Sequence, residues 1–272
     1  MNMNEQLSIF AKGIPYPEGP AFDSHGNLFV CARRDGYIAK ITPDGQVSVF
    51  AETMGKPNGL AIDHQDRLYV ADAHRRQILT IEPDATLGVL IPTVTQGHAL
   101  IGPNDLCLHA SGVLYFTDPG VSVSEGAGAV YRYSLQTSEL LCLANGLDFP
   151  NGLAVSADET RLYIAETHTS RILAVDLTCG CFSSPQIVCE LGEDAKPDGM
   201  EWMDCDHLVV ALHGSGTLAF IRTSDWSCHR VRIADGAHPT NLVLHNNRFY
   251  ITEDSEQAVF ALGAGQIWSV NE

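Results

Sequence analysis

The sequence is poor in basic residues. Its 272 residues include 16 Lys and Arg against 33 Asp and Glu, which gives a formal net charge of −17. Such a surface repels phosphate backbones and anionic lipid headgroups. Nucleic acid and membranes are therefore disfavoured as partners, and we expect a small-molecule substrate. The same charge favours cations in general, although it identifies no site.

Long apolar runs and a basic leader are also missing. No uninterrupted apolar stretch approaches the roughly 20 residues that span a bilayer. The first six residues, Met1 to Gln6, have neither the positive charge nor the apolar region of a signal peptide. We therefore expect a cytoplasmic protein.

The eight cysteines lack the spacing of a zinc site. Cys179 and Cys181 form one close pair, but no second pair at zinc spacing accompanies them. Cys31 and Cys107 lie within apolar runs, where cysteine behaves as a small hydrophobic residue. We expect reduced, structural thiols.

Several common catalytic motifs do not occur. The sequence has no P-loop, no Gly-x-Gly-x-x-Gly between a strand and a helix, no His-Glu-x-x-His and no Gly-x-Ser-x-Gly. No segment shows sustained helical periodicity. Nothing in the sequence therefore supports nucleotide binding, a zinc protease or a nucleophilic serine.

What the sequence does contain is a sixfold repeat. One tripeptide pattern recurs, and its prolines are separated by 40, 46, 47, 47 and 42 residues. The tripeptides are Pro17-Glu18-Gly19, Pro57-Asn58-Gly59, Pro103-Asn104-Asp105, Pro150-Asn151-Gly152, Pro197-Asp198-Gly199 and Pro239-Thr240-Asn241.

Each tripeptide is followed by short strand-like runs. In the fourth unit these are Leu153–Val155, Leu162–Ile164 and Ile172–Val175, and weaker fourth runs such as Val47–Phe50 precede the next tripeptide. Short β-runs at a period of about 40–50 residues are typical of four-stranded propeller blades. We predict an all-β fold, a six-bladed β-propeller with four-stranded blades, as a single domain over residues 1–272.

A propeller has to close its ring, because an open one exposes strand edges. The segment Leu7–Lys12 resembles Val47–Glu52, the fourth run before the second tripeptide. We predict that Leu7–Lys12 completes the last blade. Ile267–Val270 competes for the same position.

The middle residues of the tripeptides should form a ring at one mouth of the central channel. They are Glu18, Asn58, Asn104, Asn151, Asp198 and Thr240. Two carboxylates and several amide oxygens suit a hard divalent cation and balance its charge. A single Pro-Asn-Gly is more often an ordinary turn, but a turn does not require Glu at position 18. We therefore predict an axial metal site.

The loops after the second strands should surround the same mouth. They contribute candidate substrate contacts at His74, Asp118, His168 and His213, and a long connection brings His98 towards them. Each of these His residues taken alone is more often a surface residue. The Gly- and Ser-rich loop 118–129 is a candidate lid.

Five motifs together resemble a known family. They are Tyr16-Pro17-Glu18-Gly19-Pro20, Gly102-Pro103-Asn104-Asp105-Leu106, Tyr115-Phe116-Thr117-Asp118-Pro119, Phe149-Pro150-Asn151-Gly152-Leu153 and Lys196-Pro197-Asp198-Gly199-Met200. In this order they resemble the senescence marker protein/gluconolactonase/luciferin-regenerating enzyme family, also called regucalcin-like. The resemblance covers nearly the whole chain, from about Pro15 to Leu262.

The resemblance implies one divalent metal ion, with Ca²⁺ expected first and Zn²⁺, Mn²⁺ or Mg²⁺ as alternatives. It implies Glu18, Asn151 and Asp198 as direct ligands, and Asp198 also as the general base. Asn104 would be a further ligand or would contact the substrate. Gly102 stands where the family's animal sugar lactonases have an Arg that contacts the sugar, which indicates a more apolar pocket on that side.

The function expected from these features is metal-dependent hydrolysis of a lactone, with gluconolactone as one possible substrate. Two other interpretations remain open. One is phosphotriester or fluorophosphate hydrolysis at the same metal site, and the other is a non-catalytic propeller that binds metal. The sequence does not determine the oligomeric state.

Overall fold

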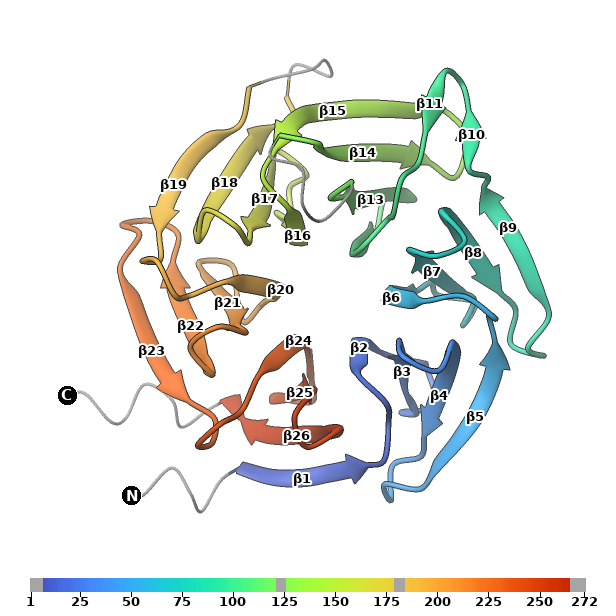
Figure 1. Ribbon diagram of the computed structural model, residues 1–272, viewed down its shortest axis with the longest axis vertical. Coiled ribbons are helices and arrows are strands. Elements are labelled where there is room, and N and C mark those ends of the chain that lie inside the picture. The colour runs from blue at the N-terminus through green and yellow to red at the C-terminus, as the bar shows by residue number, and fades with distance from the viewer. Residues whose placement is uncertain (1–6, 121–125, 179–183, 265–272) are drawn as a thin grey trace.

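The computed structural model describes residues 7–120, 126–178 and 184–264. Six four-stranded antiparallel sheets are arranged around a central axis, each with its first strand innermost (Figure 1). The prediction of an all-β, six-bladed propeller is confirmed. The elements in these three ranges are all strands.

The strand boundaries follow the repeats. The strands of the first three blades are β2 (Pro17–Phe22), β3 (Leu28–Ala32), β4 (Tyr37–Ile41) and β5 (Val47–Glu52); β6 (Pro57–Ile62), β7 (Leu68–Asp72), β8 (Gln77–Ile81) and β9 (Leu87–Ile91); and β12 (Leu106–His109), β13 (Val113–Asp118), β14 (Gly128–Ser134) and β15 (Leu140–Leu147). A separate hairpin, β10 (Val94–Thr95) with β11 (His98–Ala99), lies between the second and third blades in the chain.

The remaining blades have the same order. Their strands are β16 (Pro150–Val155), β17 (Arg161–Glu166), β18 (Arg171–Asp176) and β19 (Gln186–Glu190); β20 (Pro197–Trp202), β21 (His207–Leu212), β22 (Thr217–Arg222) and β23 (Cys228–Arg232); and β24 (Pro239–His245), β25 (Arg248–Glu253) and β26 (Ala258–Gly263), completed by β1 (Leu7–Lys12).

Burial explains why some strands are easier to recognise than others. All five residues of β3 and of β7 are buried, because both faces of each of these strands pack against neighbouring blades. Such strands read as continuous apolar runs. The outer strand β5 has mostly exposed residues and only one buried position, Ala51. Its apolar signal is correspondingly weak.

The hydrophobic core is divided among the interfaces between blades. The buried apolar residues form six clusters, and each cluster joins two adjacent blades. Alternate residues of β7 illustrate this: Leu68 and Val70 pack towards the first blade, while Tyr69 and Ala71 pack towards the third. The period of two along a strand thus connects each blade to both of its neighbours.

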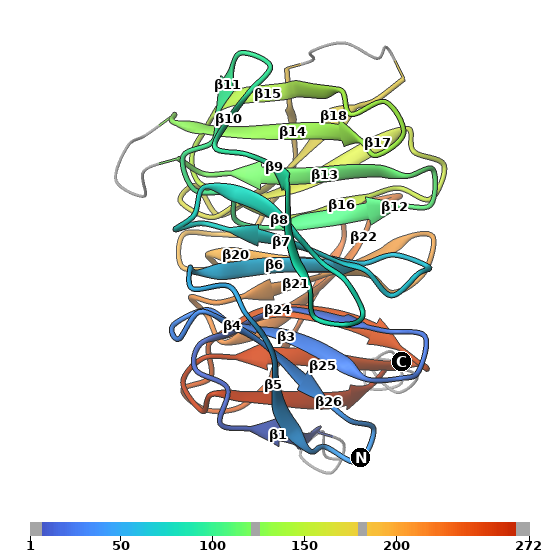
Figure 2. The same ribbon diagram turned by 90° about the vertical axis from the view of Figure 1, so that its right-hand side faces the viewer.

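Strand β1 closes the ring. It pairs antiparallel with β26, with Leu7 opposite Leu262 and Lys12 opposite Ala258, and the two strands lie side by side in both views (Figures 1 and 2). The prediction that Leu7–Lys12 completes the last blade is confirmed. The competing segment, residues 267–270, lies outside the described residues.

Two further expectations can be compared with the structure. Within the described ranges no helix is long and apolar enough to cross a membrane. Cys31, Cys107, Cys142, Cys189, Cys205 and Cys228 are not in disulfides, whereas Cys179 and Cys181 lie outside the described residues. Burial raises the pKa of Cys189 to about 11 and disfavours its reactive thiolate.

Candidate functional site at the mouth of the channel

Five of the six tripeptides interrupt the pairing of an innermost strand, and the third lies directly before its strand, β12. The ladder between β2 and β3 shifts register between Glu18 and Ala21, and β16 and β20 show the same irregularity after Pro150 and Pro197. Irregular pairing of this kind redirects side chains and is frequent beside functional sites.

The redirected side chains meet in one cavity of about 170 Å³. It is lined by Tyr16, Glu18, Arg33, Asn58, Asn104, Phe149, Asn151, Thr167, Lys196, Asp198 and His213. The cavity thus contains five of the six tripeptide middle residues. The sixth, Thr240, is fully buried, and its hydroxyl donates to the carbonyl of Pro17 at 2.7 Å. Its role is structural.

Two carboxylates face this cavity without a hydrogen-bonding partner among the described residues. Glu18 is only 5% exposed, and Asp198 is half-buried. Burial, followed by the charge of Asp198, raises the pKa of Glu18. Burial likewise raises the pKa of Asp198, although His213 opposes this. A cation would relieve this arrangement, in which burial and the charge of Asp198 both destabilise the charged form of Glu18.

The amide of Asn151 is held in one orientation. Thr167 donates its hydroxyl hydrogen to the carbonyl of Pro197 at 2.7 Å, so its oxygen is left to accept from Asn151 Nδ2 at 3.2 Å. The Oδ1 atom of Asn151 is therefore the one available to a ligand. Supporting contacts of this kind orient metal ligands in proteins. Thr167 fixes the donor atom, although it is not itself a tripeptide residue.

Asn104 is anchored through its backbone. Its carbonyl accepts from Gly59 N at 2.7 Å, and its N–H donates to Thr117 O at 2.9 Å. The side-chain amide has no hydrogen-bonding partner in the described part of the chain, although Asn104 is only 9% exposed. An amide held rigidly with its polar atoms unused is suited to contact a metal ion or a substrate.

The donor set fits a hard divalent cation. Glu18 and Asp198 supply two negative charges, and Asn104 and Asn151 can add neutral oxygens, which are the ligand types that Ca²⁺ and Mg²⁺ prefer. No group of three or more His, Cys, Asp and Glu residues placed to hold a metal ion occurs in the described ranges. The candidate set has only two members of those residue types, because its other two members are Asn.

Three cavity residues have a strained backbone. Tyr16, Phe149 and Lys196 each precede the proline of a tripeptide and have φ of 53°, 61° and 46°. Positive φ in residues other than Gly is uncommon, and such strain concentrates at functional sites. Their carbonyls accept from the N–H groups of Arg33, Thr167 and His213, at 3.1, 3.1 and 3.2 Å. The first, fourth and fifth blades therefore share this backbone conformation and this hydrogen bond. They are also the blades that carry Glu18, Asn151 and Asp198.

The expected substrate contacts are only partly brought together. Asn104 and His213 line the cavity, whereas His74, His98, Asp118 and His168 are not among the lining residues. His213 Nε2 lies 3.4 Å from Asp254 Oδ2, and this contact raises the pKa of His213.

The carboxylate of Asp118 is hydrogen-bonded to backbone N–H groups. Asp118 is 3% exposed, and its carboxylate accepts from the N–H groups of Ile101, Gly102 and Gly120 at 2.7, 2.9 and 3.1 Å. It therefore fixes the loop that leads into Pro103-Asn104-Asp105. The loop expected at 118–129 connects β13 to β14, and its residues 121–125 lie outside the described ones.

The three other histidines have ordinary environments. His74 is exposed, His98 packs edge-on against Tyr131 with ring centroids 5.4 Å apart, and His168 is exposed and stacks on Phe149 at 4.8 Å. His168 therefore contacts Phe149, which lines the cavity. The site of Gly102 has room for a side chain, since an added Cβ would meet nothing closer than 3.7 Å.

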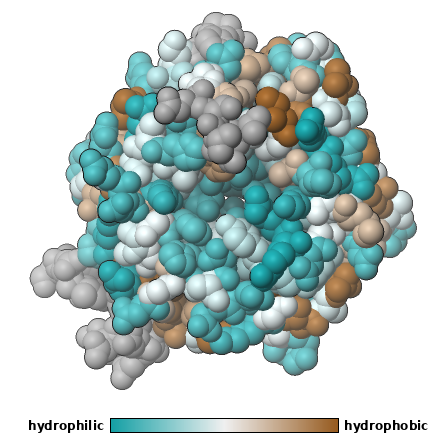
Figure 3. All heavy atoms as spheres, in the orientation of Figure 1, coloured by the Kyte–Doolittle hydropathy of each residue, from teal (hydrophilic) through white to brown (hydrophobic). Residues whose placement is uncertain are grey.

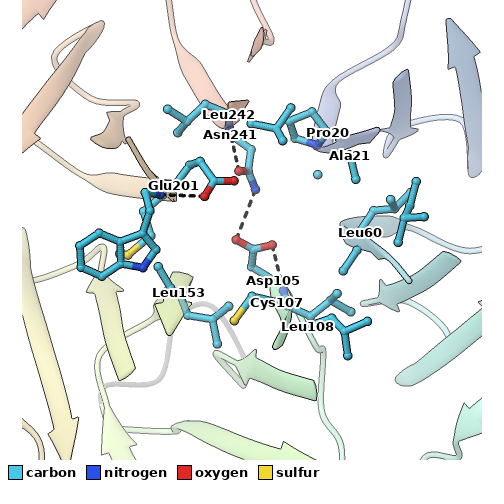
Figure 4. Close-up of a pocket in the computed structure, with 18 of the residues that line it drawn as sticks. Pro20, Ala21, Leu60, Asp105, Cys107, Leu108, Leu153, Glu201, Asn241 and Leu242 are labelled. Carbon is cyan, nitrogen blue, oxygen red and sulfur yellow. Dashed lines mark hydrogen bonds between the residues drawn. The ribbon is translucent and has the colours of Figure 1, made fainter. Parts of the chain in front are cut away.

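A second, larger cavity of about 490 Å³ lies at the other end of the channel (Figure 4). Most of its lining residues are apolar, and Asp105, Glu201 and Asn241 are polar residues near the axis. Asn241 Nδ2 donates to Asp105 Oδ2 at 3.3 Å. Because these residues come from opposite blades, they form a plug between the two cavities.

Sequence reasoning assigned no role to five residues of the first cavity: Tyr16, Arg33, Phe149, Thr167 and Lys196. A positional signal was available. Three of them directly precede a tripeptide proline, and Thr167 directly follows the second strand of its blade, as Arg33 and His213 do in theirs.

With this geometry, the chain can be compared with known proteins. Residues 48–255 match the family described as SMP-30/Gluconolactonase/LRE-like region. The chain belongs to this family. The resemblance found in the tripeptide motifs is thereby confirmed over most of the sequence.

Individual relatives of the SMP-30/gluconolactonase family agree with this assignment. A gluconolactonase of Zymomonas mobilis is 36% identical over 81 residues, which are 26% of this chain and 22% of that relative. The match therefore spans less than a quarter of that curated relative.

Solved structures match over a greater length. A Xanthomonas campestris gluconolactonase superposes with a TM-score of 0.82 at 26% identity, covering 94% of this chain and 89% of that one. A calcium-binding regucalcin of Agrobacterium tumefaciens gives 0.79 at 19% identity, covering 94% and 92%. The second likeness shows the fold alone.

Proposed function

We propose that this protein is a divalent-metal-dependent lactonase acting on a small cyclic ester. The observation that carries the proposal is the convergence of Glu18, Asn104, Asn151 and Asp198 in one cavity at the channel mouth. Membership of the SMP-30/gluconolactonase family and the similarity to two gluconolactonases support it. A small molecule, and neither nucleic acid nor a membrane, is the proposed partner.

The proposed cofactor is one divalent cation held by Glu18, Asn151 and Asp198, with Asn104 as a further ligand or as a substrate contact. Ca²⁺ is the first candidate, because the donors are all oxygen atoms; Zn²⁺, Mn²⁺ and Mg²⁺ are the alternatives. When bound, such an ion acts as a Lewis acid on the ester carbonyl and stabilises the negative charge that develops there.

The chain's own residues supply the remaining chemistry. Asp198 accepts a proton from the water that attacks the carbonyl carbon, and the acyl C–O bond then breaks. The ring oxygen leaves as an alcohol after taking up a proton, so the product is a hydroxy acid. Phe149 and Tyr16 provide aromatic walls that exclude water around the ring.

The decisive experiment uses protein stripped with EDTA and supplied separately with Ca²⁺, Mg²⁺, Mn²⁺ and Zn²⁺. The substrates are sugar lactones, aliphatic lactones and one phosphotriester. We expect lactone hydrolysis only after metal addition, and we expect Asp198→Asn to reduce kcat by at least about 100-fold, the lower range for loss of a general base. Asp235→Asn, at an exposed position, is the matched control.

Other outcomes distinguish the alternatives. Turnover of the phosphotriester alone would indicate the second hydrolase interpretation. No turnover with any metal, combined with a metal-dependent rise in melting temperature, would indicate a non-catalytic metal-binding propeller. Lactone hydrolysis by Asp198→Asn at the parent rate would remove the assigned base.

A further inference from the structure

Arg33 is a cation at the edge of the candidate active site, and its charge acts to lower the pKa values of Glu18 and Asp198. Its side chain lines the cavity, and its Nε atom is buried with no hydrogen-bond acceptor. No ion pair of the Arg33 guanidinium is found among the described residues. A buried donor left unpaired is costly, so this guanidinium is not held in place by a protein acceptor at Nε, and the part of Arg33 that lines the cavity can contact a ligand.

The position of Arg33 is fixed in advance. Its guanidinium carbon lies over the Tyr16 ring, 5.2 Å from the centroid, and its N–H donates to the Tyr16 carbonyl at 3.1 Å. Tyr16 is itself held at a positive φ of 53°. A guanidinium stacked on an aromatic ring keeps its N–H edge free for planar anions such as carboxylate or phosphate.

Lys196 provides a second cation at the same mouth. It has a φ of 46° and lines the same cavity, and its stem passes close to Gly214, where an added Cβ would meet Lys196 Cβ and Cδ at 3.1 Å. No ion pair of its ammonium group is found in the described ranges. Tyr16 and Lys196 thus have the same strained backbone conformation before a proline. Tyr16 supports Arg33, whereas Lys196 carries its own positive charge.

The charges around the cavity do not balance without a further anion. A divalent cation would neutralise Glu18 and Asp198, as proposed above. Asp254 pairs with His213, which can itself carry a charge, and therefore offsets at most one of the cations at the mouth. At least one positive charge is then left there, although the protein as a whole has a net charge of −17. Local positive potential in an acidic protein selects for an anionic group on the ligand.

We infer that the natural substrate is an anionic lactone, whose carboxylate or phosphate substituent is bound by Arg33 and Lys196. This inference rests on the proposed lactonase function and specifies its substrate class. Arg33 makes the paired, directional contact, and Lys196 adds a point charge. The reacting ester remains at Glu18, Asn104, Asn151 and Asp198, while the anionic substituent lies towards blades one and five.

The test compares lactones in which an anionic substituent replaces a neutral one. One pair is γ-butyrolactone γ-carboxylate with γ-valerolactone, and the other is phosphogluconolactone with gluconolactone, so the two pairs separate carboxylate from phosphate. We expect the anionic member of at least one pair to have a kcat/KM about 10-fold higher or more. We expect Arg33→Gln and Lys196→Gln each to lower that ratio by about 10-fold, as for loss of a charged hydrogen bond. Added salt should lower it as well.

Arg34→Gln is the matched control, because Arg34 is the next residue, is exposed and does not line the cavity. Its anionic-to-neutral ratio should equal that of the parent. A binding readout avoids turnover altogether: oxocyclopentane carboxylate should raise the melting temperature of the Ca²⁺-loaded protein more than cyclopentanone does, and Arg33→Gln should remove the difference.

The outcomes separate this inference from the proposed function. Equal kcat/KM for both members of both pairs would overturn the anionic substrate and leave the lactonase function intact. A loss of kcat/KM in Arg33→Gln that is equal for the anionic and the neutral lactone would do the same. If no lactone is hydrolysed, the proposed function fails. The binding comparison then decides the inference alone, because equal stabilisation by the two ketones would contradict an anion-binding site.

Discussion

Asn241 and Asp105, 136 residues apart in the sequence, meet across the channel axis, where Asn241 Nδ2 donates to Asp105 Oδ2 at 3.3 Å. Each side chain also accepts from the N–H group of the next residue: Asp105 Oδ1 accepts from Leu106 N at 2.9 Å, and Asn241 Oδ1 accepts from Leu242 N at 2.8 Å. The two side chains therefore make equivalent contacts and differ only in that Asp105 has Oδ2 where Asn241 has Nδ2. These residues take the tripeptide position that is Gly in the other four blades.

This near symmetry predicts that the two residues can be exchanged. Asp105→Asn would bring two amide donors together, and Asn241→Asp would bring two buried carboxylates together. We expect each single variant to lose about 1–3 kcal/mol of unfolding free energy, the usual cost of an unsatisfied buried group. The double variant restores one donor and one acceptor and should recover most of that loss, as measured by denaturant unfolding. Additive losses in the double variant would show that the contact contributes nothing.

Removing one charge at the channel mouth should have opposite effects with and without metal. Glu18→Gln keeps the shape of the side chain but relieves the repulsion between Glu18 and Asp198, whose pKa values are both raised by burial. In EDTA we expect a higher melting temperature than that of the parent. With Ca²⁺ added we expect a smaller rise. Glu52→Gln, on the exposed side of β5, should change neither value. A lower melting temperature in EDTA would contradict the repulsion.

The tight packing around the axis predicts a large effect of one methyl group. A Cβ on Gly152 would collide with the carbonyl oxygen of Asp198 and lie 2.6 Å from Gly199 Cα, both of which are backbone atoms of the next blade. We expect Gly152→Ala to destabilise the fold by about 3 kcal/mol, towards the upper end for overpacking. Gly263→Ala is the control, because its Cβ would meet nothing within 4 Å. Equal unfolding curves for the two variants would show that the blades can move apart.

A carboxyl group in the larger cavity should make stability depend on pH. Burial raises the pKa of Glu201 to about 7 from 4.5, although the Trp202 N–H, at 2.7 Å, opposes this. The folded protein therefore keeps the proton over a range in which the unfolded chain has lost it. The free energy of unfolding should fall as the pH rises from about 4.5 to about 7.

The measurement is denaturant unfolding of metal-free protein at several pH values. Glu201→Gln should reduce the slope over this range, because it removes one of the buried carboxyl groups whose pKa is raised, the others being Glu18, Asp105 and Asp198. Glu139→Gln, at an exposed position, should keep the parent slope. The same slope in Glu201→Gln and the parent would assign the effect to another group.

The repeat made the fold predictable, and the reason is physical. Blades are local units, so their strands and turns follow one another in the sequence, and even the closing strand Leu7–Lys12 could be identified by its likeness to Val47–Glu52. The middle residues of the tripeptides were predictable too, because equivalent positions of a ring converge on its axis.

Other parts of the site depend on geometry that no repeat encodes. The spacing that placed Asp118 on a loop did not show that its carboxylate would turn back to the N–H groups of Ile101 and Gly102. The link from Thr167 to the amide of Asn151 depends on side-chain rotamers. The contact between Asp105 and Asn241 could be predicted only by knowing that blades three and six face each other. The sequence does show that these two tripeptides have Asp and Asn where the other four have Gly.

Closure by β1 also affects how the chain reaches its final form. Leu7 and its partner Leu262 are 255 residues apart, so a ribosome working at about 5–20 residues per second completes β26 on the order of 10 s or more after β1. Throughout that interval β1 lacks its partner. A nascent or truncated chain that ends before β26 therefore leaves this strand unpaired, and such strands are the surfaces through which unfinished chains join one another.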